Sequence, residues 1–149
     1  MKTTNRFDQA ILKLYHAFHS GTLVPECNQQ CAVGTILNNS ESWKHFSDNH
    51  GSTVLNYVGL VNENFGRRFG GYKPSELLQI EVTFLKACGY QVPLHYSHKK
   101  PEQPLNKDTL FSGLTAVVSL LCKLDNLPDV MNCQALFMYK PKPYSQFAN

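Results

Sequence analysis

The segment 108–124 restricts the fold more than any other, because it carries the longest apolar helical pattern in the chain. Its few polar residues fall on one narrow face, formed by Ser112, Ser119 and Lys123. A helix that is apolar around most of its circumference has to be covered by other elements. We therefore expect residues 108–124 to form the central helix of a bundle.

Other segments show the same periodicity. Apolar residues recur at helical spacing in 5–19, 54–69 and 75–88, and shorter helices are expected at 31–37 and 128–138. The Val, Leu and Tyr residues of 54–61 leave a strand there as a minor alternative. The pattern predicts an all-α fold, an irregular bundle of about five or six helices.

The length of 149 residues fits one domain, 1–149, because domains typically have about 100–150 residues. Prolines and lysines punctuate the residues from about 90 to 107, which we expect to form a long exposed loop. The segment KPKPYSQFAN, 140–149, is expected to be a frayed tail.

The amino-acid composition limits the cellular locations and the kinds of binding partner that we expect. Hydrophobic residues make up 42% of the chain and charged residues 17%, which is not a disordered composition. The opening MKTTNRFDQA has no apolar segment, and no run approaches the ~18 apolar residues of a membrane span, so we expect a cytoplasmic protein without a membrane partner. The net charge of +3 comes from scattered residues, so nucleic-acid binding is not indicated.

Five cysteines are present, and in an intracellular chain the default expectation is reduced, mostly buried thiols. Cys27 and Cys31, with His19 upstream, also resemble a zinc ligand set, since thiolate and imidazole are the ligands that zinc prefers. Alternatively, Cys31 lies just inside a helix N-terminus and is a candidate for a reactive thiol of lowered pKa. Buried structural cysteines, a zinc site and a reactive thiol all stay open.

Glu81 is an anomaly in the helix ELLQIEVTFLKAC. It projects at about 40° from Leu77, near the middle of the apolar stripe. A buried carboxylate has to be paired, hydrogen-bonded, metal-bound or protonated. Glu81 therefore either forms a structural pair or belongs to a functional site. For a structural pair, Arg67 or Arg68 is the first candidate partner and a loop histidine is the second.

The loop WKHFSDNHGS places His45 and His50 near Asp48 and Ser52. Asp, Asn and Gly are also ordinary turn formers, so this grouping is a weak signal of catalysis. A histidine-rich loop is nevertheless a reasonable rim for a pocket, where an imidazole acts as acid, base or ligand. His45 and His50 are thus weak catalytic candidates together with Glu81.

The segments FDQAILKLYHAFHSGTL, CAVGTIL, LNYVGLVNENFGRRFGGY and PSELLQIEVTFLKACGY resemble a small bacterial family of similar length. Its members often carry the label of a Na+-translocating NADH-quinone reductase component. That label implies a membrane-anchored ferredoxin and flavin reductase, whose iron–sulfur cluster needs cysteines spaced roughly C-x4-C-x2-C. The five cysteines here form no such cluster, and the family implies no catalytic residues, so none are carried over.

The chain contains no dinucleotide-binding, P-loop, zinc-protease, EF-hand or nucleophile-elbow motif. We therefore expect, first, a non-catalytic helical protein that binds another protein or a small molecule. A homodimer is one form that this protein could take. The alternative is a metal- or thiol-dependent protein that uses Cys27 and Cys31, with zinc as the cofactor. A third is a small-molecule enzyme with Glu81 and a loop histidine as acid and base.

Overall fold

A computed structural model describes residues 4–128 and 132–142. Its helical elements, in chain order, are α1 (Asn5–Ser20), α2 (Ala32–Ile36), the 3-10 helix η1 (Ser42–Phe46), α3 (Tyr57–Asn64), α4 (Pro74–Ala87), α5 (Lys107–Leu124) and α6 (Cys133–Leu136). Within the described ranges the only extended pairing is an isolated bridge between Phe69 and Tyr72. The expected all-α irregular bundle is confirmed.

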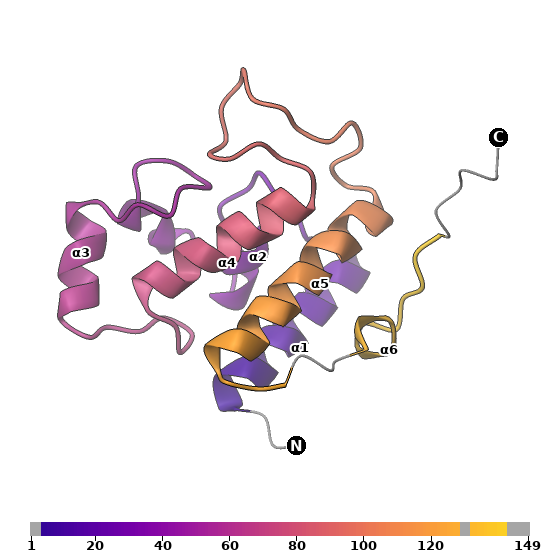
Figure 1. Cartoon of the computed structure of the whole chain (residues 1–149), viewed down its shortest axis with the longest axis horizontal. Coiled ribbons are helices and arrows are strands. Elements are labelled where there is room, and N and C mark those ends of the chain that lie inside the picture. The colour runs from indigo at the N-terminus through magenta and orange to yellow at the C-terminus, as the bar shows by residue number, and fades with distance from the viewer. Residues whose placement is uncertain (1–3, 129–131, 143–149) are drawn as a thin grey trace.

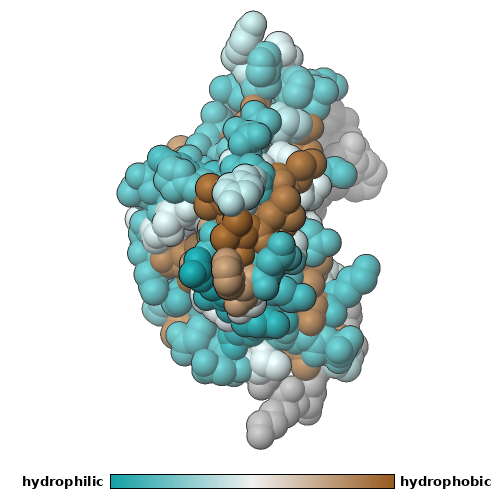
Figure 2. Space-filling view, turned by 90° about the vertical axis from the view of Figure 1, so that its left-hand side faces the viewer, coloured by the Kyte–Doolittle hydropathy of each residue, from teal (hydrophilic) through white to brown (hydrophobic). Residues whose placement is uncertain are grey.

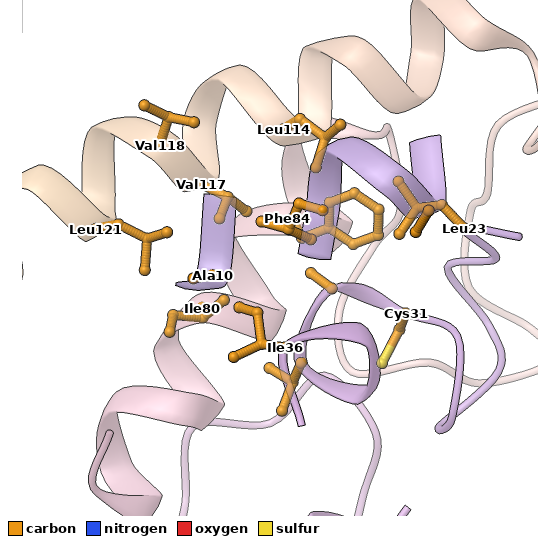
Figure 3. Packing of buried hydrophobic residues seen from close by; sticks show 14 of the residues in the cluster. Ala10, Leu23, Cys31, Ile36, Ile80, Phe84, Leu114, Val117, Val118 and Leu121 are labelled. Atoms are coloured by element: carbon orange, nitrogen blue, oxygen red, sulfur yellow. The ribbon is translucent and has the colours of Figure 1, made fainter. Parts of the chain in front are cut away.

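Helices α4 and α5 run antiparallel at the centre of the molecule, and α1 and α2 pack behind them (Figure 1). The buried face of α5 includes Leu114, Val117, Val118 and Leu121, all without exposed surface. Figure 3 shows these side chains meeting residues of α1, α2 and α4 in one apolar core. The prediction that 108–124 is a central, strongly buried helix is therefore confirmed.

Gly113 allows α4 and α5 to approach closely. A Cβ atom at this position would lie 2.5 Å from Sγ of Cys88 and 2.7 Å from Cδ1 of Phe84. Both residues lie on the buried side of the α4 segment. The missing side chain at position 113 thus sets how tightly the two central helices pack.

Some helix limits differ from the sequence prediction. The helix expected over 54–69 is only Tyr57–Asn64. The side chain of Asn56 caps the start of this helix by accepting a hydrogen bond from the Gly59 amide, and Gly66, at φ 71°, follows the end of the helix. The last helix, expected over 128–138, is shortened to Cys133–Leu136, and 129–131 lie outside the described residues. Most of the expected frayed tail, 143–149, also lies outside them.

The long loop expected near 90–107 is present between α4 and α5 and rises above the bundle (Figure 1). It ends at Asn106, whose side chain caps α5 by accepting from the amides of Asp108 and Thr109. None of the helices in the described part of the chain has both the length and the apolar character that crossing a membrane requires.

Helix α3 lies at one end of the molecule and exposes most of its apolar side chains. Figure 2 shows apolar residues gathered at the centre of this face. Tyr57 is 81% exposed, Leu60 48% and Phe65 73%, whereas Gly59 is the buried residue of the helix. The α3 face, defined here as Tyr57, Val58, Leu60 and Phe65, is therefore an apolar surface.

Candidate metal centre

Cys31 lies directly before α2 and is completely buried. Its Sγ atom accepts a hydrogen bond from the Gly34 amide at 3.4 Å and contacts the carbonyl oxygen of Asn28 at 3.6 Å. A Cβ atom on Gly34 would lie 2.2 Å from that same carbonyl oxygen. Glycine at position 34 therefore allows the chain to fold back so that Cys31 faces inward.

Glu81 lies in the buried stripe of α4 with 1% of its surface exposed, as its helical projection predicts. Its Oε1 atom accepts a hydrogen bond from the Val33 amide of α2 at 3.2 Å. Its Oε2 atom lies 2.6 Å from Nε2 of His50. The first candidate partners, Arg67 and Arg68, were wrong: Arg67 bonds Asn62, and Arg68 bonds the Gly71 carbonyl and approaches Glu76.

His50 is positioned by contacts on its backbone and on its ring. Its carbonyl oxygen accepts a hydrogen bond from the Leu94 amide at 2.8 Å, so the long loop holds the histidine loop against the bundle. Its ring stands edge-on to Trp43, with the centroids 5.5 Å apart. The Trp43 indole in turn donates to the carbonyl oxygen of Asn28 at 2.9 Å. Only 13% of the His50 side chain is exposed.

These contacts bring three possible metal ligands together. One ligand atom each of Cys31, His50 and Glu81 lies within 4.8 Å of the other two. Sulfur, imidazole nitrogen and carboxylate oxygen are all ligands of Zn2+, with bonds of about 2.0–2.3 Å, which places tetrahedral ligand atoms roughly 3.3–3.8 Å apart. Small side-chain movements would therefore suffice to close the three around one ion.

Electrostatics disfavour a thiolate in the absence of a cation. Burial raises the pKa of the Cys31 thiol well above its usual value, and the nearby Glu81 carboxylate raises it further. The same two causes raise the pKa of Cys88 to about 12. This environment is the opposite of the lowered pKa that a reactive Cys31 would need, and it corrects that sequence hypothesis.

The remaining sequence candidates lie outside this cluster. Cys27 is half-buried and is not one of the three grouped residues. The His19 imidazole, in the last turn of α1, bonds the carbonyl oxygen of Phe137. His45 is exposed on η1. The structure thus combines one residue from each of three separate sequence signals, Cys31, His50 and Glu81. Cys27, His19 and His45 are not part of this cluster.

No local sequence pattern indicates that Cys31, His50 and Glu81 belong to one site. They come from the start of α2, a loop and the middle of α4, and no spacing rule connects them. The buried projection of Glu81 was the one feature that pointed to an interior polar centre. Comparisons with protein-family models, with curated proteins and with solved structures found no match to this chain.

Proposed function

We propose that this protein binds a divalent transition-metal ion, with Zn2+ the best fit, through Cys31, His50 and Glu81. One observation carries the proposal: three chemically different ligand atoms lie within 4.8 Å of one another. Mixed sulfur, nitrogen and oxygen ligands are the set that zinc accepts, whereas Mg2+ and Ca2+ take oxygen ligands.

A purely structural role for Glu81 explains less of the arrangement. The bonds from Val33 and His50 already give both carboxylate oxygens a partner. The buried Cys31 thiol also lies beside that carboxylate, and its ionised form is disfavoured there. A dication between them would stabilise the thiolate and the carboxylate together.

Three protein ligands are the number found in catalytic zinc sites, which keep a fourth position for water or substrate. An ion held by these residues would supply Lewis acidity and would lower the pKa of a bound water. In this chain, the bond from the Leu94 amide would hold the backbone of His50, and the Trp43 ring would limit the movement of the imidazole.

The test is a titration of chelator-treated protein with Co2+ and then Zn2+. We expect one Co2+ per chain, with visible absorption of a tetrahedral ion and a sulfur-to-cobalt band, and displacement of Co2+ by Zn2+. Cys31→Ser should remove the sulfur band, and Glu81→Gln should weaken binding at least tenfold. Cys27→Ser and His45→Ala are matched controls outside the cluster and should bind as the parent does. Substoichiometric binding, or equal loss in the controls, would exclude this centre.

The α3 face favours a second, separate function, contact with another protein. Tyr57, Leu60 and Phe65 form an exposed apolar surface of a kind that often marks an interface. We propose a second copy of this chain as the partner, because a two-fold contact needs only this one self-complementary surface. Light scattering should give a dimer mass that Phe65→Glu reduces to a monomer, while Tyr96→Glu, on the loop between α4 and α5, keeps the dimer. A parent protein that stays monomeric at every concentration would contradict this.

A further inference from the structure

A cavity of about 400 Å3, called the loop cavity here, is lined by Glu26 and by residues of the chain that follows α4. Cavities of about 300–1,000 Å3 are the usual size of small-molecule sites. The loop cavity shares no residue with the Cys31–His50–Glu81 cluster. Its ionisable side chains are Glu26, Tyr90, His95, His98, Lys99 and Lys100.

The lysines of the loop cavity outnumber its carboxylate. Oε2 of Glu26 accepts a hydrogen bond from the Tyr90 hydroxyl at 3.0 Å and lies 3.9 Å from Nζ of Lys100. Lys99 forms no ion pair within the described part of the chain. Both lysines are exposed, so a molecule in the cavity can reach them. One carboxylate against two ammonium groups leaves positive charge, and the lining favours an anion.

Backbone contacts determine which nitrogen of each imidazole is left for a ligand. Nδ1 of His95 accepts a hydrogen bond from the Ser97 amide at 3.1 Å, so the proton of this ring is on Nε2. Nδ1 of His98 lies 2.7 Å from the carbonyl oxygen of Pro93, which can only accept, so there the proton is on Nδ1. Nε2 of His95 is therefore a donor, whereas Nε2 of His98 can take a proton from a ligand.

The two imidazoles are close enough to contact the same group, because their ring centroids are 5.3 Å apart. The loop that carries them is also held in place. The Gln91 amide donates to the carbonyl oxygen of Lys99 at 2.8 Å, and the Gln91 side chain accepts from the Lys99 amide at 3.1 Å. The lining is thus positioned before a ligand binds, which reduces the entropy that binding costs.

A phosphate monoester matches this set of groups better than a carboxylate does. It has three terminal oxygens and a charge of about −1.5 to −2 at pH 7, and its last proton dissociates near pH 6. Its oxygens can accept from His95 and from the two lysines, and an oxygen that keeps its proton can donate to His98. A carboxylate has only two oxygens and one charge.

The apolar part of the lining favours an organic group on the phosphate. Leu94 and Tyr96 also line the loop cavity. The Tyr96 ring is 96% exposed, and its centroid lies 4.4 Å from that of His95, with the two planes tilted by 32°. An exposed aromatic ring at the cavity can cover a flat or apolar group.

We infer that the loop cavity binds a small organic phosphate monoester. The two lysines and the two histidines hold the phosphate, and the organic group lies against Tyr96. This site goes beyond metal binding and uses none of the three proposed metal ligands.

The experiment titrates phenyl phosphate, inorganic phosphate and benzoate into isotope-labelled full-length protein at constant ionic strength. The protein is treated with chelator first, so that no phosphate binds through a metal ion. Backbone amide and histidine ring signals are followed by NMR. We expect saturable shifts at residues 90–100, with phenyl phosphate binding at least about threefold more tightly than either other probe.

Variants assign the binding to the loop cavity. Lys99→Ala should raise the Kd of phenyl phosphate about threefold, as the loss of one exposed charge contact usually does, and should keep the parent thermal midpoint. Glu26→Gln removes the opposing charge and keeps an acceptor for Tyr90, so it should lower the Kd by about the same factor. Lys123→Ala, in the last turn of α5, makes the same change in net charge as Lys99→Ala and should keep the parent Kd.

Several results would overturn the inference. Shifts that do not saturate would exclude a site, and benzoate that binds as tightly as phenyl phosphate would exclude selection of a phosphate. Equal affinity for inorganic phosphate would exclude the contact with Tyr96. Equal effects of Lys99→Ala and Lys123→Ala would mean that the anion binds the positive surface in general. The protein is metal-free throughout, so none of these results depends on the cobalt titration.

Discussion

Nε2 of His50 lies 2.6 Å from Oε2 of Glu81, and this contact joins a surface loop to the most buried carboxylate of α4. The two residues are 31 positions apart in the chain. The Leu94 amide donates to the backbone carbonyl of His50, so this residue is bonded to both the long loop and the core.

Replacing Glu81 should separate its structural role from its role as a ligand. Glu81→Ala removes the acceptor of the Val33 amide and of the His50 ring, and it should lower the free energy of unfolding by on the order of 3 kcal/mol. Glu81→Gln keeps the shape and one acceptor oxygen, so it should cost less than the alanine variant. Denaturant melts of metal-free protein measure both.

The neighbouring residue Gln79, on the exposed face of α4, offers a matched control. Gln79→Ala should change the free energy of unfolding by less than about 0.5 kcal/mol, as surface substitutions usually do. If Glu81→Ala were equally neutral, the buried contact to His50 would not contribute to stability.

Thiol labelling of the native protein should distinguish the cysteines by burial. Cys27 is half-buried, whereas Cys31, Cys88 and Cys122 are buried. Because the thiolate is the reacting form, the raised pKa of Cys31 slows its reaction as well. A maleimide or disulfide reagent should therefore modify Cys27 well before Cys31, as mass spectrometry of the digested protein would show. Faster labelling of Cys31 would mean that the α2 segment opens readily.

Gly113→Ala should destabilise the contact between α4 and α5. Alanine favours a helix over glycine by about 1 kcal/mol, but the new Cβ would meet Cys88 and Phe84 at distances that atoms do not adopt. Overpacking of this kind costs about 1–3 kcal/mol, so we expect a net loss in thermal melts.

The neighbouring Ser112→Ala lies on the exposed face of the same helix and should be neutral or slightly stabilising. Adding Cys88→Ala to Gly113→Ala removes the nearest atom and should restore part of the loss. No recovery in the double variant would place the strain somewhere other than Cys88.

The sequence predicted α1, α4 and α5 because each of these helices buries one periodic face, and periodicity is a local property. The segment 108–124 and the position of Glu81 followed from it directly. The two limits of α3 did not, because the Asn56 cap sets its start and Gly66 follows its end, although the apolar pattern runs from Val54 to Phe69. Apolar spacing alone therefore predicts the first and last residues of such a helix poorly.

The candidate site was predictable only in parts. Cys31, His50 and Glu81 each stood out for a different reason, and the chain brings them together through a turn that requires Gly34 and a loop held by Leu94. Neither contact follows from local spacing. The sequence therefore grouped Cys31 with Cys27 and His19, which are close along the chain, instead of with residues that are close in space.

The stability of the metal-free protein should fall at alkaline pH, and Cys88 provides the clearest case. Burial and the Glu81 carboxylate raise the pKa of this thiol to about 12 in the folded state, above its ordinary value of 9.0. The folded protein thus keeps a proton that the unfolded chain has lost. The resulting stabilisation is complete below the unfolded pKa and is lost as the pH rises toward the folded one. In urea melts between about pH 9 and 12, this thiol alone should lower the free energy of unfolding by up to about 1.4 kcal/mol per pH unit.

Two cysteine variants test whether Cys88 causes this decline. Cys88→Ala should be less stable at neutral pH, because it leaves a gap in the core, yet its stability should fall less steeply as the pH rises. Cys27→Ala, which removes a half-buried thiol, should decline nearly as steeply as the parent. A Cys88→Ala profile parallel to that of the parent would show that ionisation of this thiol does not oppose folding.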